Sequence, residues 1–265
     1  MSIARFRQLH EGDCFVMPNP WDAGSAKILH AVGFEALATT SAGHAHTLGR
    51  KDAERAVGRG EALDHAADIV AATPLPVNGD LERGYGDNPD EVAATVRLAI
   101  GAGLAGCSIE DATGDPANPI YDRALATDRI AAAVEACGDS GFVLTARAEN
   151  LLHGIEDIDD TIERLQGFAA AGAECVYAPG IRSIEVVRQV AGSVGCWVNV
   201  LAAPYFTTAE LAEAGVSRIS IGSGLSRAAY GALIAAADEI LKEGTFNFAA
   251  QAPGFSDIET MLTNP

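Results

Sequence analysis

The chain has 265 residues, of which 48% are hydrophobic, and its 36 acidic against 18 basic side chains give a formal net charge of −18. An acidic surface repels phosphate backbones and anionic lipid headgroups, so we expect neither nucleic acid nor a membrane as a partner. The N-terminus lacks the apolar stretch of a secretory signal, and five scattered cysteines without a C-x-x-C pair argue against disulfide bonds and structural zinc, so we expect a cytoplasmic enzyme or binding protein.

Short β-type runs alternate along the chain with longer amphipathic stretches. The expected strands are Cys14–Pro18, Ala36–Thr40, Pro76–Asp80, Gly106–Glu110, Phe142–Arg147, Glu174–Ala178, Trp197–Leu201 and Arg218–Ile221. The expected helices are Ala23–Ala31, Ala53–Ala72, Pro89–Ala102, Ala124–Ala136, Ile155–Ala171, Ser183–Ala191, Thr208–Ala214 and Ser226–Lys242. The helical stretches are rich in Ala, Glu and Leu and carry apolar residues at helical spacing.

Eight strands, each followed by a helix, predict a (β/α)8 TIM barrel. A doubly wound sheet also alternates in this way, but no G-x-G-x-x-G follows the first strand to mark a nucleotide site. No Pro/Ser-rich linker or low-complexity tract divides the chain. We therefore expect one barrel domain over residues 1–243 and a C-terminal tail over residues 244–265.

Polar side chains gather where the predicted strands end, which in such barrels is the catalytic rim. They are Asn19, Thr40, Ser41, Asp80, Glu82, Glu110, Asp111, Arg147, Glu149 and Asn199. Carboxylates that converge without histidine or cysteine suit a hard cation, Mg2+ or else Mn2+. Any one of them alone is more often a helix cap, so the metal site is predicted from the set on neighbouring strands.

Arg147 is the one arginine of this acidic rim. It is either the ion-pair partner of the carboxylates or a clamp for an anionic substrate, and we favour the clamp. His44 and His46 form an H-x-H after the second strand, but no later strand ends in histidine, so zinc is not expected there.

Several segments then resemble the isocitrate lyase/phosphoenolpyruvate mutase superfamily. They are PNPWDAGSA, TTSAGHAHTLGRKD, GDLERGYGD, SIEDATG and TARAENLL, in the superfamily's order and spacing between Pro18 and Tyr230. The resemblance implies that Asp80 binds Mg2+ and that Glu82, Glu110 and Asp52 hold the metal and its water shell. It also implies that the turn Thr40–Ala42 and Arg147 bind the substrate carboxylate, and we add Asn199 to the substrate-binding residues.

The common chemistry of this superfamily is an enolate of a 2-oxo acid, stabilised by Mg2+ while a bond at C3 breaks or forms. The lyase motif K-[KR]-C-G-H is absent, and its cysteine aligns with Asn118. The mutases also have an asparagine there, but two lysines of their loop align with Ala112 and Pro116, and the histidine of their sixth strand aligns with Pro179. Neither signature is complete.

We therefore expect a lyase that cleaves a C–C bond, or decarboxylates, next to a small 2-oxo or 2-hydroxy carboxylate, with Asn118 on a mobile lid facing the leaving group. Its partner is a small 2-oxo acid or dicarboxylate, and the resemblance implies a homo-oligomer, either tetramer or dimer. The alternatives are phosphoenolpyruvate mutase or phosphonopyruvate hydrolase chemistry, and a non-catalytic scaffold that binds dicarboxylates. Tyr85, His44 and a metal-bound water are the candidate proton donors.

Overall fold

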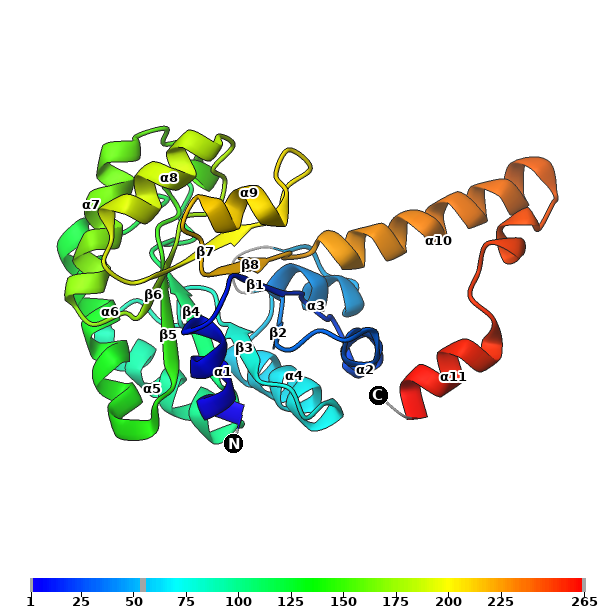
Figure 1. Ribbon diagram of the computed structural model, residues 1–265, viewed down its shortest axis with the longest axis horizontal. Coiled ribbons are helices and arrows are strands. Elements are labelled where there is room, and N and C mark those ends of the chain that lie inside the picture. The colour runs from blue at the N-terminus through cyan, green and yellow to red at the C-terminus, as the bar shows by residue number, and fades with distance from the viewer. Residues whose placement is uncertain (1, 53–55, 264–265) are drawn as a thin grey trace.

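Eight parallel strands curl into a nearly closed barrel in the computed structural model, which describes residues 2–52 and 56–263 (Figure 1). The strands are β1 (Phe15–Met17), β2 (Leu37–Ala38), β3 (Val77–Asp80), β4 (Gly106–Glu110), β5 (Val143–Arg147), β6 (Cys175–Tyr177), β7 (Trp197–Leu201) and β8 (Arg218–Ser220). Strand β1 pairs with β8, with Val16 opposite Ile219. At the remaining seam the N–H of Ala38 donates to the carbonyl of Pro18 at 3.0 Å. The predicted (β/α)8 barrel is confirmed.

Helices follow the strands and cover the outside of the sheet (Figure 1). The helices that the sequence predicts are α2 (Ala23–Val32), α4 (Arg59–Ala72), α5 (Pro89–Gly101), α6 (Arg123–Cys137), α7 (Ile158–Ala170), α8 (Ile184–Ser193), α9 (Thr208–Glu213) and α10 (Gly224–Glu243). The second expected helix, Ala53–Ala72, corresponds to α4, which begins at Arg59; residues 53–55 lie outside the described ranges.

Three further helices were not predicted: α1 (Ser2–His10), α3 (Ser41–Thr47) and α11 (Phe255–Thr263). Helix α3 has the sequence SAGHAHT, which contains no large apolar residue to reveal a helical period. It forms because Thr40 caps it, accepting from the N–H of Gly43 at 3.2 Å.

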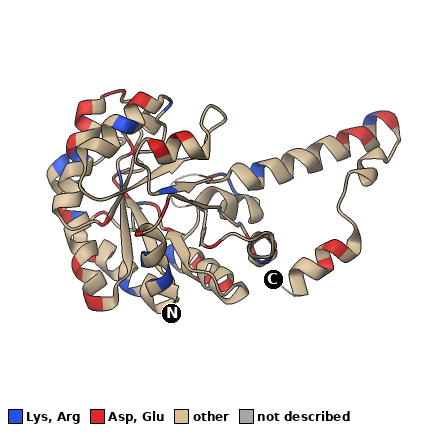
Figure 2. Cartoon of the chain, in the orientation of Figure 1, with Lys and Arg blue, Asp and Glu red and all other residues tan. Residues whose placement is uncertain are grey.

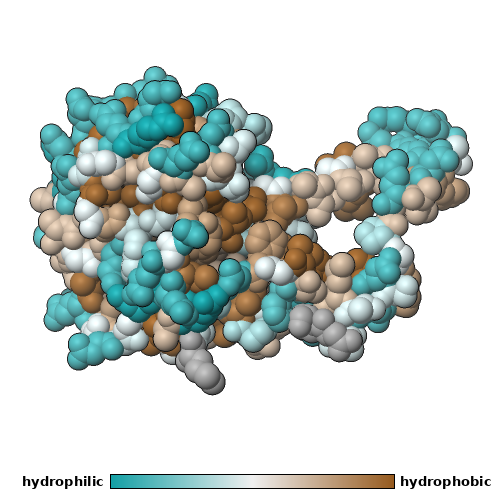
Figure 3. Space-filling view, in the orientation of Figure 1, coloured by the Kyte–Doolittle hydropathy of each residue, from teal (hydrophilic) through white to brown (hydrophobic). Residues whose placement is uncertain are grey.

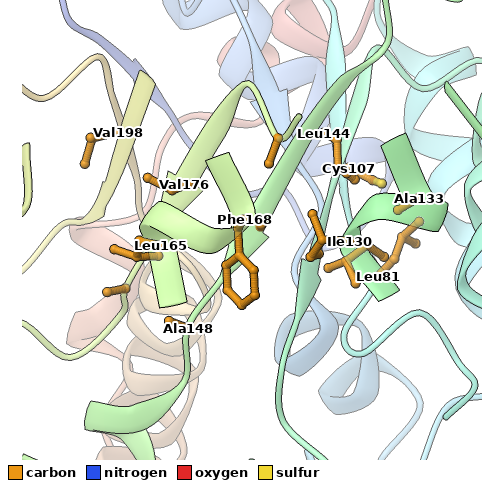
Figure 4. Close-up of a cluster of buried hydrophobic side chains, with 14 of the residues drawn as sticks. Leu81, Cys107, Ile130, Ala133, Leu144, Ala148, Leu165, Phe168, Val176 and Val198 are labelled. Carbon is orange, nitrogen blue, oxygen red and sulfur yellow. The ribbon is translucent and has the colours of Figure 1, made fainter. Parts of the chain in front are cut away.

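The main core lies between the sheet and its surrounding helices. Outward-facing side chains of the strands, such as Leu144 and Val176, pack against Ile130 of α6 and against Leu165 and Phe168 of α7 (Figure 4). Because most strands are covered outside by helices and filled inside by side chains, several of them are nearly continuous apolar runs.

A second, smaller core closes the lower end of the barrel. Helix α1 lies there, and its Phe6 packs with inward-facing residues of the strands, among them Met17, Val143 and Cys175. His10 on the same helix is also buried. Helix α1 thus closes the end of the barrel where the strands begin, and the opposite end, where the strands finish, is open.

Helix α10 extends away from the barrel instead of covering its last strand (Figure 1). Ser226 is its one buried residue, while Leu233, Ile234 and Leu241 are 63%, 62% and 83% exposed. The chain then returns, and α11 contacts α2. Figure 3 shows hydrophobic side chains along this arm and on the neighbouring face of the barrel. The segment expected as a tail therefore holds a helix, α11, which packs against the barrel domain.

Charged side chains are spread over the outer helices, with acidic ones in the majority (Figure 2). Within residues 2–52 and 56–263, no helix combines the length and the apolar character needed to cross a lipid bilayer.

Candidate active site

Two adjoining pockets open at the end of the barrel where the strands finish. The first, which we call the mouth pocket, is lined by the predicted residues Thr40, Ser41, Ala42, Asp80, Arg147 and Asn199. The second, the rim pocket, is lined by the predicted residues Asp52, Glu82 and Glu110 and shares Ser41 and Arg147 with the first. Ten residues were predicted to bind metal, bind substrate or act in catalysis. The structure brings nine of them to these two pockets, and Asn118 is the exception.

Arg147 at the end of β5 joins the two pockets. Its Nη1 lies 3.0 Å from Oδ1 of Asp80, its Nη2 3.1 Å from Oε2 of Glu110, and its Nε 2.9 Å from Oε1 of Glu149. The side chains of the four residues are between 4% and 18% exposed. One guanidinium therefore serves three largely buried carboxyl groups, which outnumber it.

Burial and the crowding of carboxylates both shift pKa values in this group. Burial raises the pKa of Glu110 well above its ordinary value; Arg147 opposes that rise, and the carboxylates of Glu149 and Asp80 add to it. Partial burial and the charge of Asp80 also raise the pKa of Asp52. A further cation at this rim would relieve the mutual repulsion of the carboxylates.

The start of helix α3 faces the same carboxylates. Ser41 is its first residue, and its backbone N–H donates to Oδ2 of Asp80 at 3.0 Å. The amide of Asp80 in turn donates to the hydroxyl of Thr39 at 2.8 Å. Helix N-termini favour anions because their first N–H groups have no partner within the helix. The arrangement holds Asp80 in place at the start of α3.

The loop after β3 carries Glu82 in an unusual backbone conformation. Glu82 and Tyr85 have φ angles of 49° and 57°, in the left-handed region that L-residues seldom adopt. The guanidinium of Arg129 on α6 holds this loop, donating to the carbonyls of Gly86 at 3.1 Å, Asp87 at 3.0 Å and Arg83. A buried residue on a neighbouring helix thus fixes the position of Glu82 in the rim pocket.

Asp111 follows Glu110 directly but points elsewhere. Its Oδ2 lies 3.0 Å from Nη1 of Arg164 on α7, and its Oδ1 accepts from the N–H of Glu149 at 2.8 Å. Burial raises the pKa of Asp111 to about 6, against the effects of these two partners. Asp111 therefore supports the loop after β5 and does not line either pocket.

The expected lid is a short hairpin after β4, in which Ala112 bridges Ile120. Its residues Gly114, Asp115 and Pro116 line the rim pocket. Asn118 lies on the exposed side, where its Nδ2 lies 3.4 Å from Oδ2 of Asp115 in the same hairpin. The structure thus places this hairpin beside the rim pocket but does not bring Asn118 to either pocket.

Two of the proposed proton donors also lie elsewhere. His44 stacks on His65 of α4 with their ring centres 3.8 Å apart, and both line a groove between α2 and α4. The ring of Tyr85 packs against the core, and burial raises its pKa. Neither residue lines the mouth or rim pocket.

The floor of the mouth pocket contains polar residues that the sequence analysis did not single out. Arg218, Ser220 and Tyr177 line it beside Asn199. Nε of Arg218 donates to Oδ1 of Asn199 at 2.9 Å, and Nδ2 of Asn199 donates to the hydroxyl of Ser220 at 3.0 Å. The sequence could have pointed to Arg218, because it lies in a predicted strand whose other residues are small or apolar. A charge inside a barrel strand is costly and therefore unusual.

The rim residues suit Mg2+ by the chemistry of their donors. Among the described residues, no group of three or more His, Cys, Asp or Glu side chains is arranged so that it could coordinate a metal ion by itself. Mg2+ needs no such cage, because it keeps several waters and takes one or two carboxylates from the protein. Asp80 and Glu110, with an excess of negative charge around them, fit that requirement.

Comparison with known proteins gives a consistent result. Residues 6–241 match the family model described as phosphoenolpyruvate phosphomutase. A crystal structure from Burkholderia cenocepacia J2315, described as a lyase/mutase, is 48% identical with a TM-score of 0.96, covering 100% of this chain and 96% of that one. A Mycobacterium tuberculosis H37Rv protein of unassigned function is 36% identical over 81% of this chain and 80% of its own. The 2-methylisocitrate lyase of Escherichia coli K12 is 34% identical over 74% of this chain and 69% of its own length.

Proposed function

Because the chain belongs to the phosphoenolpyruvate phosphomutase family, we propose that it is a Mg2+-dependent lyase that cleaves a C–C bond next to a small 2-oxo or 2-hydroxy carboxylate. The observation that carries this proposal is the group of three carboxylates around Arg147, set against the first N–H of α3. A metal bound there would supply a Lewis acid that stabilises an enolate.

The residues of the chain would divide the remaining work. Asp80 and Glu110 would hold the metal, with Glu82 and Asp52 orienting its waters. Arg147 and the polar turn Thr40–Ala42 would bind the substrate carboxylate, as donors already aimed at the pocket. The hairpin that carries Asp115 and Pro116 would exclude water by closing over the rim pocket.

Phosphoryl chemistry is the less favoured alternative. Pro179 lines the mouth pocket where a mutase would need a histidine, and the hairpin over the rim pocket carries Asp115 and Pro116 without a lysine. A phosphoryl group in transfer is stabilised by cations, whereas Asp115 adds a negative charge beside it. A C–C bond cleaved through an enolate makes no such demand.

Pyruvate or glyoxylate release from a panel of acids tests the proposal. The panel contains oxaloacetate, 2-methylisocitrate, isocitrate, dimethylmalate and phosphonopyruvate, with Mg2+ present. We expect release from a C–C substrate, abolished by a chelator and by Asp80→Ala but not by Asp139→Asn, an exposed residue in the short helix before β5. Release from phosphonopyruvate alone would establish C–P chemistry instead. Binding of these acids without any turnover would establish the non-catalytic scaffold.

We also propose that the chain functions as a homo-oligomer in which α10 packs against the barrel of a partner copy. Its apolar residues Leu233, Ile234 and Leu241 are exposed in the single chain, although a helix in this position normally covers the barrel. Exchange of an identical element between copies would bury these residues on both sides of a symmetric interface.

A further inference from the structure

Arg218 lies at the floor of the mouth pocket and is 1% exposed. Three of its five N–H groups have neutral partners: Nε donates to Asn199 at 2.9 Å, Nη2 to the hydroxyl of Thr145 at 2.6 Å, and Nη1 lies 3.2 Å from Nε2 of His10. In the described part of the chain, no aspartate or glutamate forms an ion pair with it.

The partner below Arg218 is itself uncharged. Nδ1 of His10 lies 2.8 Å from the carbonyl of Phe6, so that nitrogen carries the proton and Nε2 accepts from Arg218. Burial, and then the charge of Arg218, lowers the pKa of His10 to about 3. The guanidinium remains a cation in any protein, so it is a buried charge that nothing around it neutralises.

The two adjoining pockets therefore differ in charge between rim and floor. At the rim, three carboxylates share Arg147: Asp80 lines the mouth pocket, Glu110 and Glu149 line the rim pocket, and a metal ion would add its charge there. At the floor, Arg218 has no carboxylate partner among the described residues, although an isolated buried charge is unfavourable unless it gains a counter-charge. The cavity directly above it is the open space in which a ligand could supply one.

A second observation at the same floor also indicates a missing ligand. Asn78 on β3 is 3% exposed and lines the mouth pocket, yet its Oδ1 has no hydrogen-bond partner among the described residues. Buried side-chain oxygens nearly always have one. A bound ligand, or a water carried in with it, would complete the hydrogen bonds of Asn78 at the same time as it neutralises Arg218.

We propose that Arg218, with Asn199 and Asn78, forms an anion subsite that selects substrates with a second carboxylate besides the one bound at the rim. This rests on the proposed function, since it assigns a substrate class, the dicarboxylates, to the same pocket. The two carboxylates of such a substrate would occupy the two ends of the pocket, and Arg218 is thus a specificity residue.

Lactate and malate test the proposal because both are 2-hydroxy acids and differ by one carboxylate. Their dissociation constants are measured by calorimetry with Mg2+ for the wild type, Arg218→Gln, Arg218→Lys and Thr145→Val. The wild type is expected to bind malate about tenfold or more tightly than lactate, as a charge-assisted hydrogen bond provides. Arg218→Gln should reduce this preference below about threefold and leave lactate binding within about threefold.

The other two variants separate charge from shape. Arg218→Lys keeps the charge and should keep most of the preference, and Thr145→Val removes only a neutral partner and should keep it as well. Equal weakening of both ligands in Arg218→Gln, or an unchanged preference, would show that Arg218 is a structural strut and overturn the proposal. So would a wild type that does not prefer malate.

Two further readouts complete the test. If Arg218→Gln does not fold, a crystal structure of the wild type with malate and Mg2+ decides: a malate carboxylate within hydrogen-bond distance of Arg218 or Asn199 supports the subsite, and one directed at the lid hairpin overturns it. Failure of the proposed function would look different, because lactate would then bind equally well with a chelator in place of Mg2+.

Discussion

The backbone N–H of Ser41 donates directly to Oδ2 of Asp80 at 3.0 Å, so the start of α3 and the end of β3 form one unit. A predicted substrate-binding residue and a predicted metal ligand are thereby coupled through a single hydrogen bond. The side chain of Ser41 takes no part in it.

Substitution of Ser41 can remove that bond without removing the helix. Ser41→Pro deletes the N–H, while proline is well suited to the first position of a helix and Thr40 already has the extended backbone that it requires. We expect kcat/KM to fall about 10- to 100-fold and the melting temperature to change by only a few degrees. Ser41→Ala keeps the N–H and should stay within about threefold of the wild type. Similar losses in both variants would show that the hydroxyl is what matters.

Arg129 is expected to affect the rim pocket without touching it. Arg129→Met leaves the carbonyls of Arg83, Gly86 and Asp87 without this donor, two of them on buried residues, and should destabilise the protein by about 3 kcal/mol. Because the loop carries Glu82, the apparent affinity for Mg2+ should also fall. Urea unfolding and a Mg2+ titration of activity measure the two effects. Arg97→Met, at an exposed position of α5, is the matched control and should change neither.

Much of this architecture could be predicted from the sequence, and the reasons lie in particular residues. The strand Trp197–Leu201 and the start of α5 at Pro89 are marked by local signals, an apolar run and a helix-starting proline, and both predictions are confirmed. The predicted superfamily is likewise confirmed by the family model over residues 6–241. Helix α3 was not predicted, because its capping residue Thr40 and its Gly43 are more typical of turns than of helices.

Other features depend on contacts between distant residues, which no local pattern encodes. The role of Arg218 arises because β8, β5 and α1 meet inside the barrel, where Thr145 and His10 become its partners. Asp111 and Glu110 are adjacent in sequence and were grouped together, yet the alternation of a strand sends one to Arg164 and the other to Arg147.

His10 gives the stability of the fold a dependence on pH. Its pKa is lowered to about 3 in the folded protein, against about 6.5 when unfolded, so only the unfolded state takes up a proton as the pH falls from 7 to 4. This contribution to stability is complete above pH 7 and should fall by about 2 kcal/mol at pH 5. Urea unfolding of the wild type and of His10→Gln at pH 8 and pH 5 measures it. The loss on acidification should be smaller in the variant, and equal losses would contradict the assignment.

Asn118 is expected to act only when the hairpin moves. In the structure it is exposed and its side chain lies near Asp115, so Asn118→Ala should leave the melting temperature unchanged within about 1 °C. If the hairpin closes during turnover and brings Asn118 to the substrate, kcat should fall about 10- to 100-fold with little change in the Mg2+ requirement. A variant with wild-type kcat would exclude a role for Asn118 in the reaction.

The exposed face of α10 should control assembly. Leu233→Glu places a charge on that face and is expected to lower the mass of the particle in light scattering coupled to size-exclusion chromatography. Lys242→Glu lies on the same helix at an exposed position and should keep the wild-type mass. A monomeric wild type would contradict the proposed exchange of α10.

Because β1 pairs with β8, the barrel can close only after the last strand has been synthesised. Phe15 of β1 is the register partner of Arg218 of β8. His10, which precedes Arg218 by 208 residues, contacts the side chain of the same arginine. Helix α1 therefore gains its contact with Arg218 only when nearly the whole barrel has been synthesised. Until then its Phe6 can pack only against earlier strands, through residues such as Val143 and Cys175, and the barrel stays open between β7 and β1. A chain cut short before residue 218 should consequently depend on chaperones, however complete its first seven strands are.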